Sequence, residues 1–175
     1  MLSAMFSALG IVLLFVGGAL GDLDLTISAV ASLTVLISII EMGVGYGFMV
    51  YAVTSALALL FFPSYFITPM YVCFVGLYPM IKYFSEKLKK PIAYLIKFAS
   101  MNLMLALMFV LAANVYGIDV HDQQLFGIDI GRYAVLLTYI IANITLLLYD
   151  YCLTKLIILY NAVIAKKLGI YKLFR

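Results

Sequence analysis

Apolar residues in this chain come in long, nearly unbroken runs, and short polar stretches separate them. The runs have neither the one-sided apolar stripe of a soluble helix nor the strict alternation of a membrane β-barrel strand. A transmembrane helix needs about 20 mainly apolar residues and satisfies its own backbone hydrogen bonds in lipid. The pattern predicts an all-α membrane protein, a bundle of six transmembrane helices forming one domain over residues 1–175. The expected spans are residues 2–21, 26–42, 47–62, 66–84, 92–116 and 132–160.

The second and third spans are the least secure, because both are short and they meet at Gly43, Gly45 and Gly47. Flexible glycines there would allow one of the two helices to be broken or tilted. The same stretch contains Val-Gly-Tyr-Gly, the centre of a potassium-channel selectivity filter. However, Gly43 and Phe48 stand where such filters carry threonine and aspartate. A glycine-rich turn between helices is the favoured interpretation, and a channel is the alternative.

Composition supports lipid as the solvent for most of the chain. Of the 175 residues, 67% are hydrophobic and 11% are charged, and the mean hydropathy is +1.18. A soluble domain of this length needs a much larger charged surface. We therefore expect the lipid bilayer to be the main partner, and no nucleic acid.

The distribution of basic residues predicts the orientation, because cytoplasmic loops of membrane proteins are enriched in Lys and Arg. Six spans place both termini and the loop between spans four and five on one side. All basic residues except Arg132 fall on that side, and the opposite side holds acidic residues. Both termini are therefore expected in the cytoplasm, with the protein a multi-pass component of the cell membrane. The basic set is Lys82, Lys87, Lys89, Lys90, Lys97, Lys155, Lys166, Lys167, Lys172 and Arg175, and the acidic set is Asp22, Asp24, Asp119, Asp122 and Asp129.

The first run could instead be a cleaved signal peptide, because Ala19 and Gly21 are small enough for a cleavage site. No basic residue precedes this run, and its removal would leave five spans. A retained first span is the favoured interpretation.

Catalytic and metal-binding patterns are absent from the sequence. The only histidine is His121, and no metalloprotease, phosphate-binding or nucleophile-elbow motif occurs. Cys73 and Cys152 both lie within apolar runs and match no metal-ligand spacing. We expect free thiols, no metal, no cofactor and no enzymatic activity.

Three charged residues lie within or beside apolar runs, where a charge is costly and raises a functional hypothesis. They are Glu41, Asp150 and Lys155. An interhelical ion pair or snorkelling to the interface is the favoured interpretation. Contact with a partner subunit or a proton relay is the alternative.

The loop before the last span carries the densest group of polar side chains on the predicted outer side, namely Asp119, His121, Asp122, Asp129 and Arg132. Such groups could cap a pocket that opens outward, or they could simply be solvated. At the other end of the chain, Ala4 and Ala8 share one face of the first span, and small residues at this spacing let another helix approach closely.

Length, span number, cytoplasmic termini and the Ala-x-x-x-Ala of the first span together resemble the substrate-binding S components of energy-coupling factor (ECF) transporters, or S-component-like membrane proteins of Gram-positive bacteria. The resemblance implies that Ala4 and Ala8 contact a coupling subunit, which is joined to two ATPase subunits. It also implies uptake of a vitamin-like small molecule bound on the outer side. The implied substrate-binding residues are Asn114, Tyr116, Asp119, His121, Asp122, Arg132, Tyr139 and Asn143.

A different class of function fits the same pattern. A non-transporting scaffold or accessory subunit of a larger membrane complex, of the cell-elongation type, would bind partner helices through its small-residue faces. Such a scaffold needs no outer pocket, so a polar cavity there would argue against it.

Overall fold

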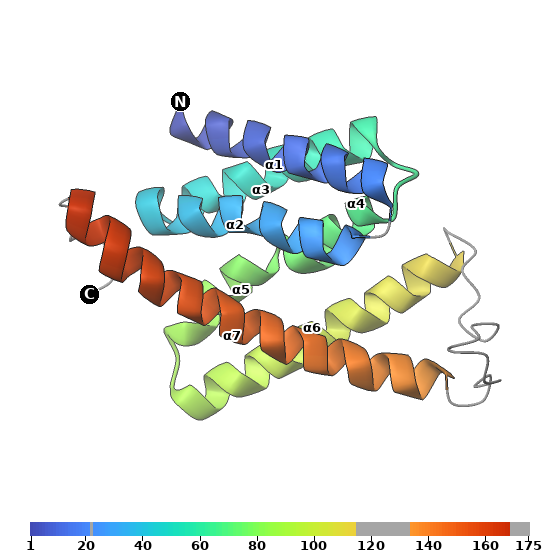
Figure 1. The fold of residues 1–175 in the computed structure, drawn as a ribbon. Coiled ribbons are helices and arrows are strands. Elements are labelled where there is room, and N and C mark those ends of the chain that lie inside the picture. Colours follow the sequence, from blue (N-terminus) through green and yellow to red (C-terminus); the bar gives the residue numbers. More distant parts are fainter. Residues whose placement is uncertain (22, 115–133, 169–175) are drawn as a thin grey trace. The chain divides into compact units, whose positions relative to one another are not determined.

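The computed structural model describes residues 1–21, 23–114 and 134–168 (Figure 1). Every regular element among these residues is helical. The elements are α1 (Leu2–Leu20), α2 (Asp24–Met42), α3 (Val44–Phe61), α4 (Ile67–Met70), the π-helical turn η1 (Tyr71–Val75), α5 (Tyr78–Glu86), α6 (Lys90–Asn114) and α7 (Ala134–Leu168).

Five of these helices are long and apolar enough to cross a membrane: α1, α2, α3, α6 and α7. In α6 the apolar stretch is Pro91–Met108, and in α7 it is Tyr139–Tyr160. The prediction of an all-helical, multi-pass membrane protein is therefore confirmed at the level of helix length and composition.

The junction between α2 and α3 is a single residue, Gly43, which has a positive φ of 97° that favours glycine. Helix α3 begins at Val44, so Gly45 and Gly47 lie within a regular helix. Both α2 and α3 are continuous, and the expectation that one of them could be broken is wrong. In a selectivity filter, backbone carbonyls line a pore, and the helical conformation of this stretch does not match that arrangement.

The predicted fourth span is the one that is interrupted. It consists of α4, the π-helical turn η1 and α5, with two turn residues, Gly76 and Leu77, before α5. Pro79 lies at the start of α5 and has no N–H to donate to the carbonyl of Val75. The amide of Gly76 bonds instead to the carbonyl of Tyr71 at 2.8 Å, which widens the turn by one residue. The expected fourth span, residues 66–84, is thus divided into α4, η1 and α5, although the backbone at Gly76 and Leu77 stays in the right-handed helical region.

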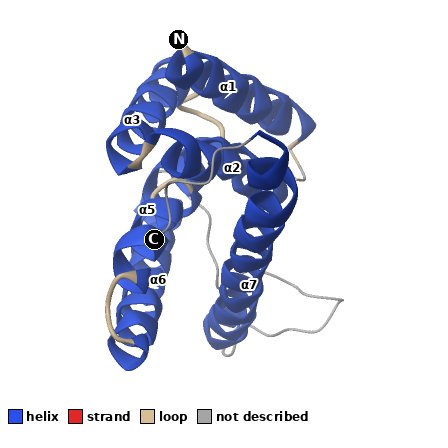
Figure 2. Cartoon of the chain, turned by 90° about the vertical axis from the view of Figure 1, so that its left-hand side faces the viewer, coloured by secondary structure: helices blue, strands red, loops and turns tan. Residues whose placement is uncertain are grey.

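Residues 1–116 and 117–175 form two compact units. In the first unit, α1, α2 and α3 pack against one another, and the segment α4–η1–α5 lies along α2 (Figures 1 and 2). Helix α6 packs against α5 and η1. The second unit is described through α7 alone, a helix of 35 residues.

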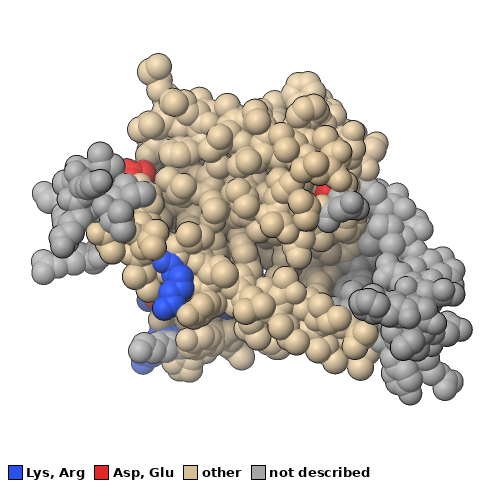
Figure 3. All heavy atoms as spheres, in the orientation of Figure 1, with Lys and Arg blue, Asp and Glu red and all other residues tan. Residues whose placement is uncertain are grey.

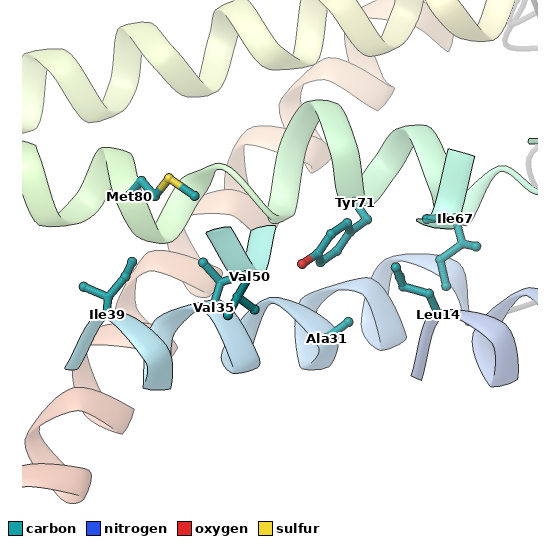
Figure 4. Packing of buried hydrophobic residues seen from close by; sticks show 9 residues of the cluster. Leu14, Ala31, Val35, Ile39, Val50, Ile67, Tyr71 and Met80 are labelled. Atoms are coloured by element: carbon teal, nitrogen blue, oxygen red, sulfur yellow. The ribbon is translucent and has the colours of Figure 1, made fainter. Parts of the chain in front are cut away.

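The core of the first unit is apolar and lies where α1, α2 and α3 meet the broken segment (Figure 4). Its largest fully buried side chain is Tyr71, whose ring extends from η1 toward α2 and α3. The other members of the core are Leu14, Ala31, Val35, Ile39, Val50, Ala58, Ile67 and Met80.

Glycines allow the helices of this unit to approach closely. A Cβ at Gly10 would lie 3.2 Å from Thr34 Oγ1 and 3.3 Å from Thr54 Oγ1. A Cβ at Gly17 would overlap the side chains of Ile27 and Ile67. Association inside a membrane depends on close van der Waals packing, because lipid is as apolar as the helices themselves. The face of α1 that carries Gly10 and Gly17 is therefore its packing face.

Candidate functional site

A group of four hydroxyl side chains lies beside the π-helical turn in the core of the first unit. We call it the hydroxyl cluster: Tyr51, Thr54 and Ser55 on α3, and Tyr71 at the start of η1. Tyr71 and Thr54 are completely buried, and Ser55 is 6% exposed. The rings of Tyr51 and Tyr71 pack with their centroids 6.2 Å apart, within the usual range for an aromatic pair.

Tyr51 ties the hydroxyl cluster to the irregular backbone of η1. Its hydroxyl donates a 2.7 Å hydrogen bond to the carbonyl oxygen of Val72. A Cβ at Gly76 would come within 2.7 Å of the Tyr71 carbonyl oxygen and 3.0 Å of the Tyr51 ring. Glycine at position 76 is thus required both by the π-helical turn and by the aromatic ring that packs on it.

The other three hydroxyls of the hydroxyl cluster differ from that of Tyr51 in their hydrogen bonding. Thr54 lies beside the Tyr71 hydroxyl, and Ser55 lies beside the Tyr51 hydroxyl. Yet within the described part of the chain, Thr54 Oγ1, Ser55 Oγ and Tyr71 OH form no hydrogen bond of acceptable geometry. Burying a hydroxyl without a hydrogen bond costs about 1–3 kcal/mol.

Buried hydroxyls on α2 provide the comparison. Ser28, Ser32, Thr34 and Ser38 each donate to a carbonyl one turn earlier in their own helix, at 2.6 to 2.9 Å. This is the usual way in which Ser and Thr are satisfied within helices. Thr54 and Ser55 are also helical but do not form this bond.

A second polar group joins α5 to α6. Lys82 is 1% exposed, and its ammonium lies 3.1 Å from Oε1 of Glu86, one turn later on α5. Lys97 of α6, 9% exposed, donates to the same oxygen at 3.1 Å. Nearby, the ammonium of Lys87 lies 4.1 Å from the centroid of the Tyr83 ring. This ion-pair group ties the two helices together at the turn between them.

The predicted partner-binding residues are on the surface. Ala4 and Ala8 are exposed on α1, whereas Ser7 and Gly10 are buried. The surface over α1 carries no charged residue (Figure 3). Val12, one turn after Ala8 on α1, is also exposed. The alanine face is thus directed away from the bundle.

Three of the predicted substrate-binding residues lie in the described part of the structure, and they belong to different units. Asn114 is the last residue of α6, in the first unit, and Tyr139 and Asn143 lie one turn apart on α7, in the second unit. The Asn143 side-chain amide donates to the carbonyl of Tyr139 at 2.9 Å. Five members of the predicted set lie outside the described residues, namely Tyr116, Asp119, His121, Asp122 and Arg132.

The three predicted intramembrane charges fall in different environments. Glu41 is half-buried in the last turn of α2. Asp150 is half-buried on α7, and its carbonyl accepts a 2.8 Å hydrogen bond from Thr154. The ammonium of Lys155 lies 5.3 Å from the centroid of the Tyr151 ring, a cation–π geometry.

Both cysteines lie on described helical elements. Cys73 is a half-buried free thiol on η1, and Cys152 is an exposed free thiol on α7. Among the residues with described positions, no group of three His, Cys, Asp or Glu side chains could hold a metal ion.

Sequence reasoning missed both polar groups of the first unit. For the ion-pair group, the spacing of Lys82 and Glu86 was a usable signal, since residues four apart on a helix are neighbours. For the hydroxyl cluster no comparable signal exists, because single hydroxyls in apolar helices are common and usually bond to their own backbone.

Comparison of the chain with known protein families, with curated proteins and with solved structures finds no match.

Proposed function

We propose that the chain crosses the membrane six times, with both termini in the cytoplasm. Residues 67–86 supply the additional crossing: at about 1.5 Å per residue they rise about 30 Å, the thickness of the hydrocarbon core. In this topology Met1 and the α5–α6 turn lie on the same side. That turn carries Lys87 and Lys89, and the positive-inside rule assigns it to the cytoplasm.

We further propose that the protein is the substrate-binding membrane subunit of an ATP-driven uptake transporter of the ECF type, which takes up a vitamin-like small molecule. The observation that carries this proposal is that Ala4 and Ala8 of α1 are exposed on the surface of the bundle. Without bulky side chains, this face allows a helix of a coupling subunit to pack directly on the α1 backbone. In S components, which the chain resembles in length, expected span number and the Ala-x-x-x-Ala of the first span, the alanine motif has this role.

The remaining steps follow from the proposed topology. The ligand reaches the bundle from the outer side, where α6 ends and α7 begins, and Asn114, Tyr139 and Asn143 belong to the proposed binding set. Energy for transport comes from the ATPase subunits, so the chain itself has to bind ligand and partner but needs no catalytic group.

Purification tests the alanine face. The protein is isolated in mild detergent from its own membrane, and copurifying proteins and small molecules are identified by mass spectrometry. We expect a coupling subunit with two ATPases. Ala4→Leu with Ala8→Leu should abolish this copurification, whereas Ala19→Leu is a control because Ala19 is also exposed on α1, near its other end. Complexes that survive the double substitution unchanged would contradict the proposal.

A scaffold function remains the second candidate, and the length of α7 favours it. At about 1.5 Å per residue, 35 residues extend about 52 Å, whereas the apolar stretch Tyr139–Tyr160 accounts for about 33 Å. The last turns of α7, with Lys166 and Lys167, therefore exceed what a membrane crossing needs. Copurification of cell-wall or division proteins, with no small molecule and no ATPase, would establish the scaffold and refute the transporter.

A further inference from the structure

The hydroxyl cluster beside the π-helical turn has unused hydrogen-bonding capacity at a place where neither lipid nor bulk water can reach it. Tyr71 OH, Thr54 Oγ1 and Ser55 Oγ each have a donor and acceptor positions; Thr54 lies beside Tyr71 and Ser55 beside Tyr51, but none of the three forms a hydrogen bond of acceptable geometry among the described residues. Tyr71 and Thr54 are completely buried, and Ser55 is more than nine-tenths buried. Such groups are normally satisfied by protein or by ordered water.

The surroundings define the chemistry of what these hydroxyls bind. The neighbouring core residues Val35, Val50 and Ala31 are apolar (Figure 4). The hydroxyl cluster is itself uncharged, so it is suited to a neutral molecule that both donates and accepts hydrogen bonds.

We propose that the hydroxyl cluster is an internal water site, in which ordered water bridges Tyr71, Thr54 and Ser55 beside the π-helical turn. A buried water makes about three hydrogen bonds to polar groups that would otherwise be unsatisfied, which matches the three hydroxyls present. The site places water at the one break in the fourth hydrophobic segment. Freed backbone groups at helix breaks within membranes are satisfied in this way. The inference is independent of the proposed transport function.

X-ray hydroxyl-radical footprinting of the full chain in lipid nanodiscs tests this site directly. Radiolysis of water produces radicals that react close to where they form, so a buried side chain is oxidised only if water lies beside it. Tyr71 and Tyr78 are matched, because both are tyrosines on the broken segment and they are 0% and 3% exposed. We expect oxidation of Tyr71 at a clearly higher rate than Tyr78. Equal, slow oxidation of the two would overturn the proposal.

Two substitutions remove hydroxyls without removing Tyr71. Thr54→Val and Ser55→Ala should each lower the oxidation rate of Tyr71 toward that of Tyr78. Ser38→Ala is the matched control, since Ser38 is completely buried and its hydroxyl already donates to the Thr34 carbonyl at 2.7 Å. It should leave the oxidation of Tyr71 unchanged. If Tyr71 is oxidised equally in all these folded variants, the hydroxyls do not hold the water and the proposal fails.

Discussion

Lys82 on α5 and Lys97 on α6 direct their ammonium groups to the same carboxylate oxygen, Oε1 of Glu86, each at 3.1 Å. One carboxylate is thus shared by two ammonium groups, which would otherwise repel each other. Both lysines are at least nine-tenths buried, whereas the Glu86 side chain is 46% exposed. The carboxylate therefore links the two buried cations to solvent at the turn between the helices.

Removing the shared anion should destabilise the α5–α6 hairpin. Breaking a fully buried ion pair costs about 3–5 kcal/mol. Because water reaches Glu86, we expect a smaller loss of about 1–3 kcal/mol for Glu86→Gln. Unfolding in detergent, followed by circular dichroism, measures it. Lys87→Gln is the control, because it removes a neighbouring charge whose described side-chain contact is with the Tyr83 ring. It should lower the free energy of unfolding by less than about 1 kcal/mol. Equal losses for the two variants would contradict the shared-anion role.

Two glycines on α3 should respond to alanine in opposite ways. A Cβ at Gly47 would overlap the Ile39 side chain of α2, so Gly47→Ala should cost about 1–3 kcal/mol through overpacking. At Gly45 nothing lies within 4 Å of the added atom. Gly45→Ala should be neutral or should stabilise the helix by up to about 1 kcal/mol. Measurement of both free energies of unfolding checks the close approach of α2 and α3, and a destabilising Gly45→Ala would show that α3 packs differently.

The hydrogen bond from Tyr51 to the Val72 carbonyl predicts a specific effect at the π-helical turn. Tyr51→Phe removes only the hydroxyl, and we expect a loss of about 1 kcal/mol in the free energy of unfolding. Hydrogen exchange should also become faster at the amides of η1, because the Val72 carbonyl loses the side-chain hydroxyl that donates to it. Tyr46→Phe is the control, since Tyr46 is 51% exposed on the same helix. Faster exchange at η1 in the control would show that the effect is not local.

Cysteine labelling tests the six-span topology. In a chain with Cys73→Ala and Cys152→Ala, single cysteines are introduced by Ser3→Cys, Lys89→Cys or Tyr65→Cys. A membrane-impermeant maleimide should label position 65 in intact cells, and positions 3 and 89 only in inverted vesicles. The reason is that position 65 precedes the broken segment and position 89 follows it. Labelling of 65 and 89 from the same side would show that residues 67–86 do not cross the membrane.

Much of the fold could be predicted from the order of the residues. The bounds of α1 and α2 agree closely with the expected runs, because a helix in lipid must be continuous and apolar over a fixed length. The division of the fourth run into α4, η1 and α5 has a local cause in the sequence, namely Pro79 three residues after Gly76. The error at α2 and α3 came from treating the whole glycine cluster as a turn, although only Gly43 forms it. Glycine is compatible with both a turn and tight helix packing, and the sequence alone does not distinguish them.

The sequence by itself determined that this is a multi-pass membrane protein and gave approximate helix bounds, because hydropathy acts through each residue separately. Only the tertiary structure decided which polar groups meet. Lys97 joins Lys82 at Glu86, and Tyr71 meets Thr54, through the packing of elements that are distant in the chain. Nothing in the local pattern encodes such meetings, since each depends on the helix rotation and the close approach that residues such as Gly10 and Gly47 permit.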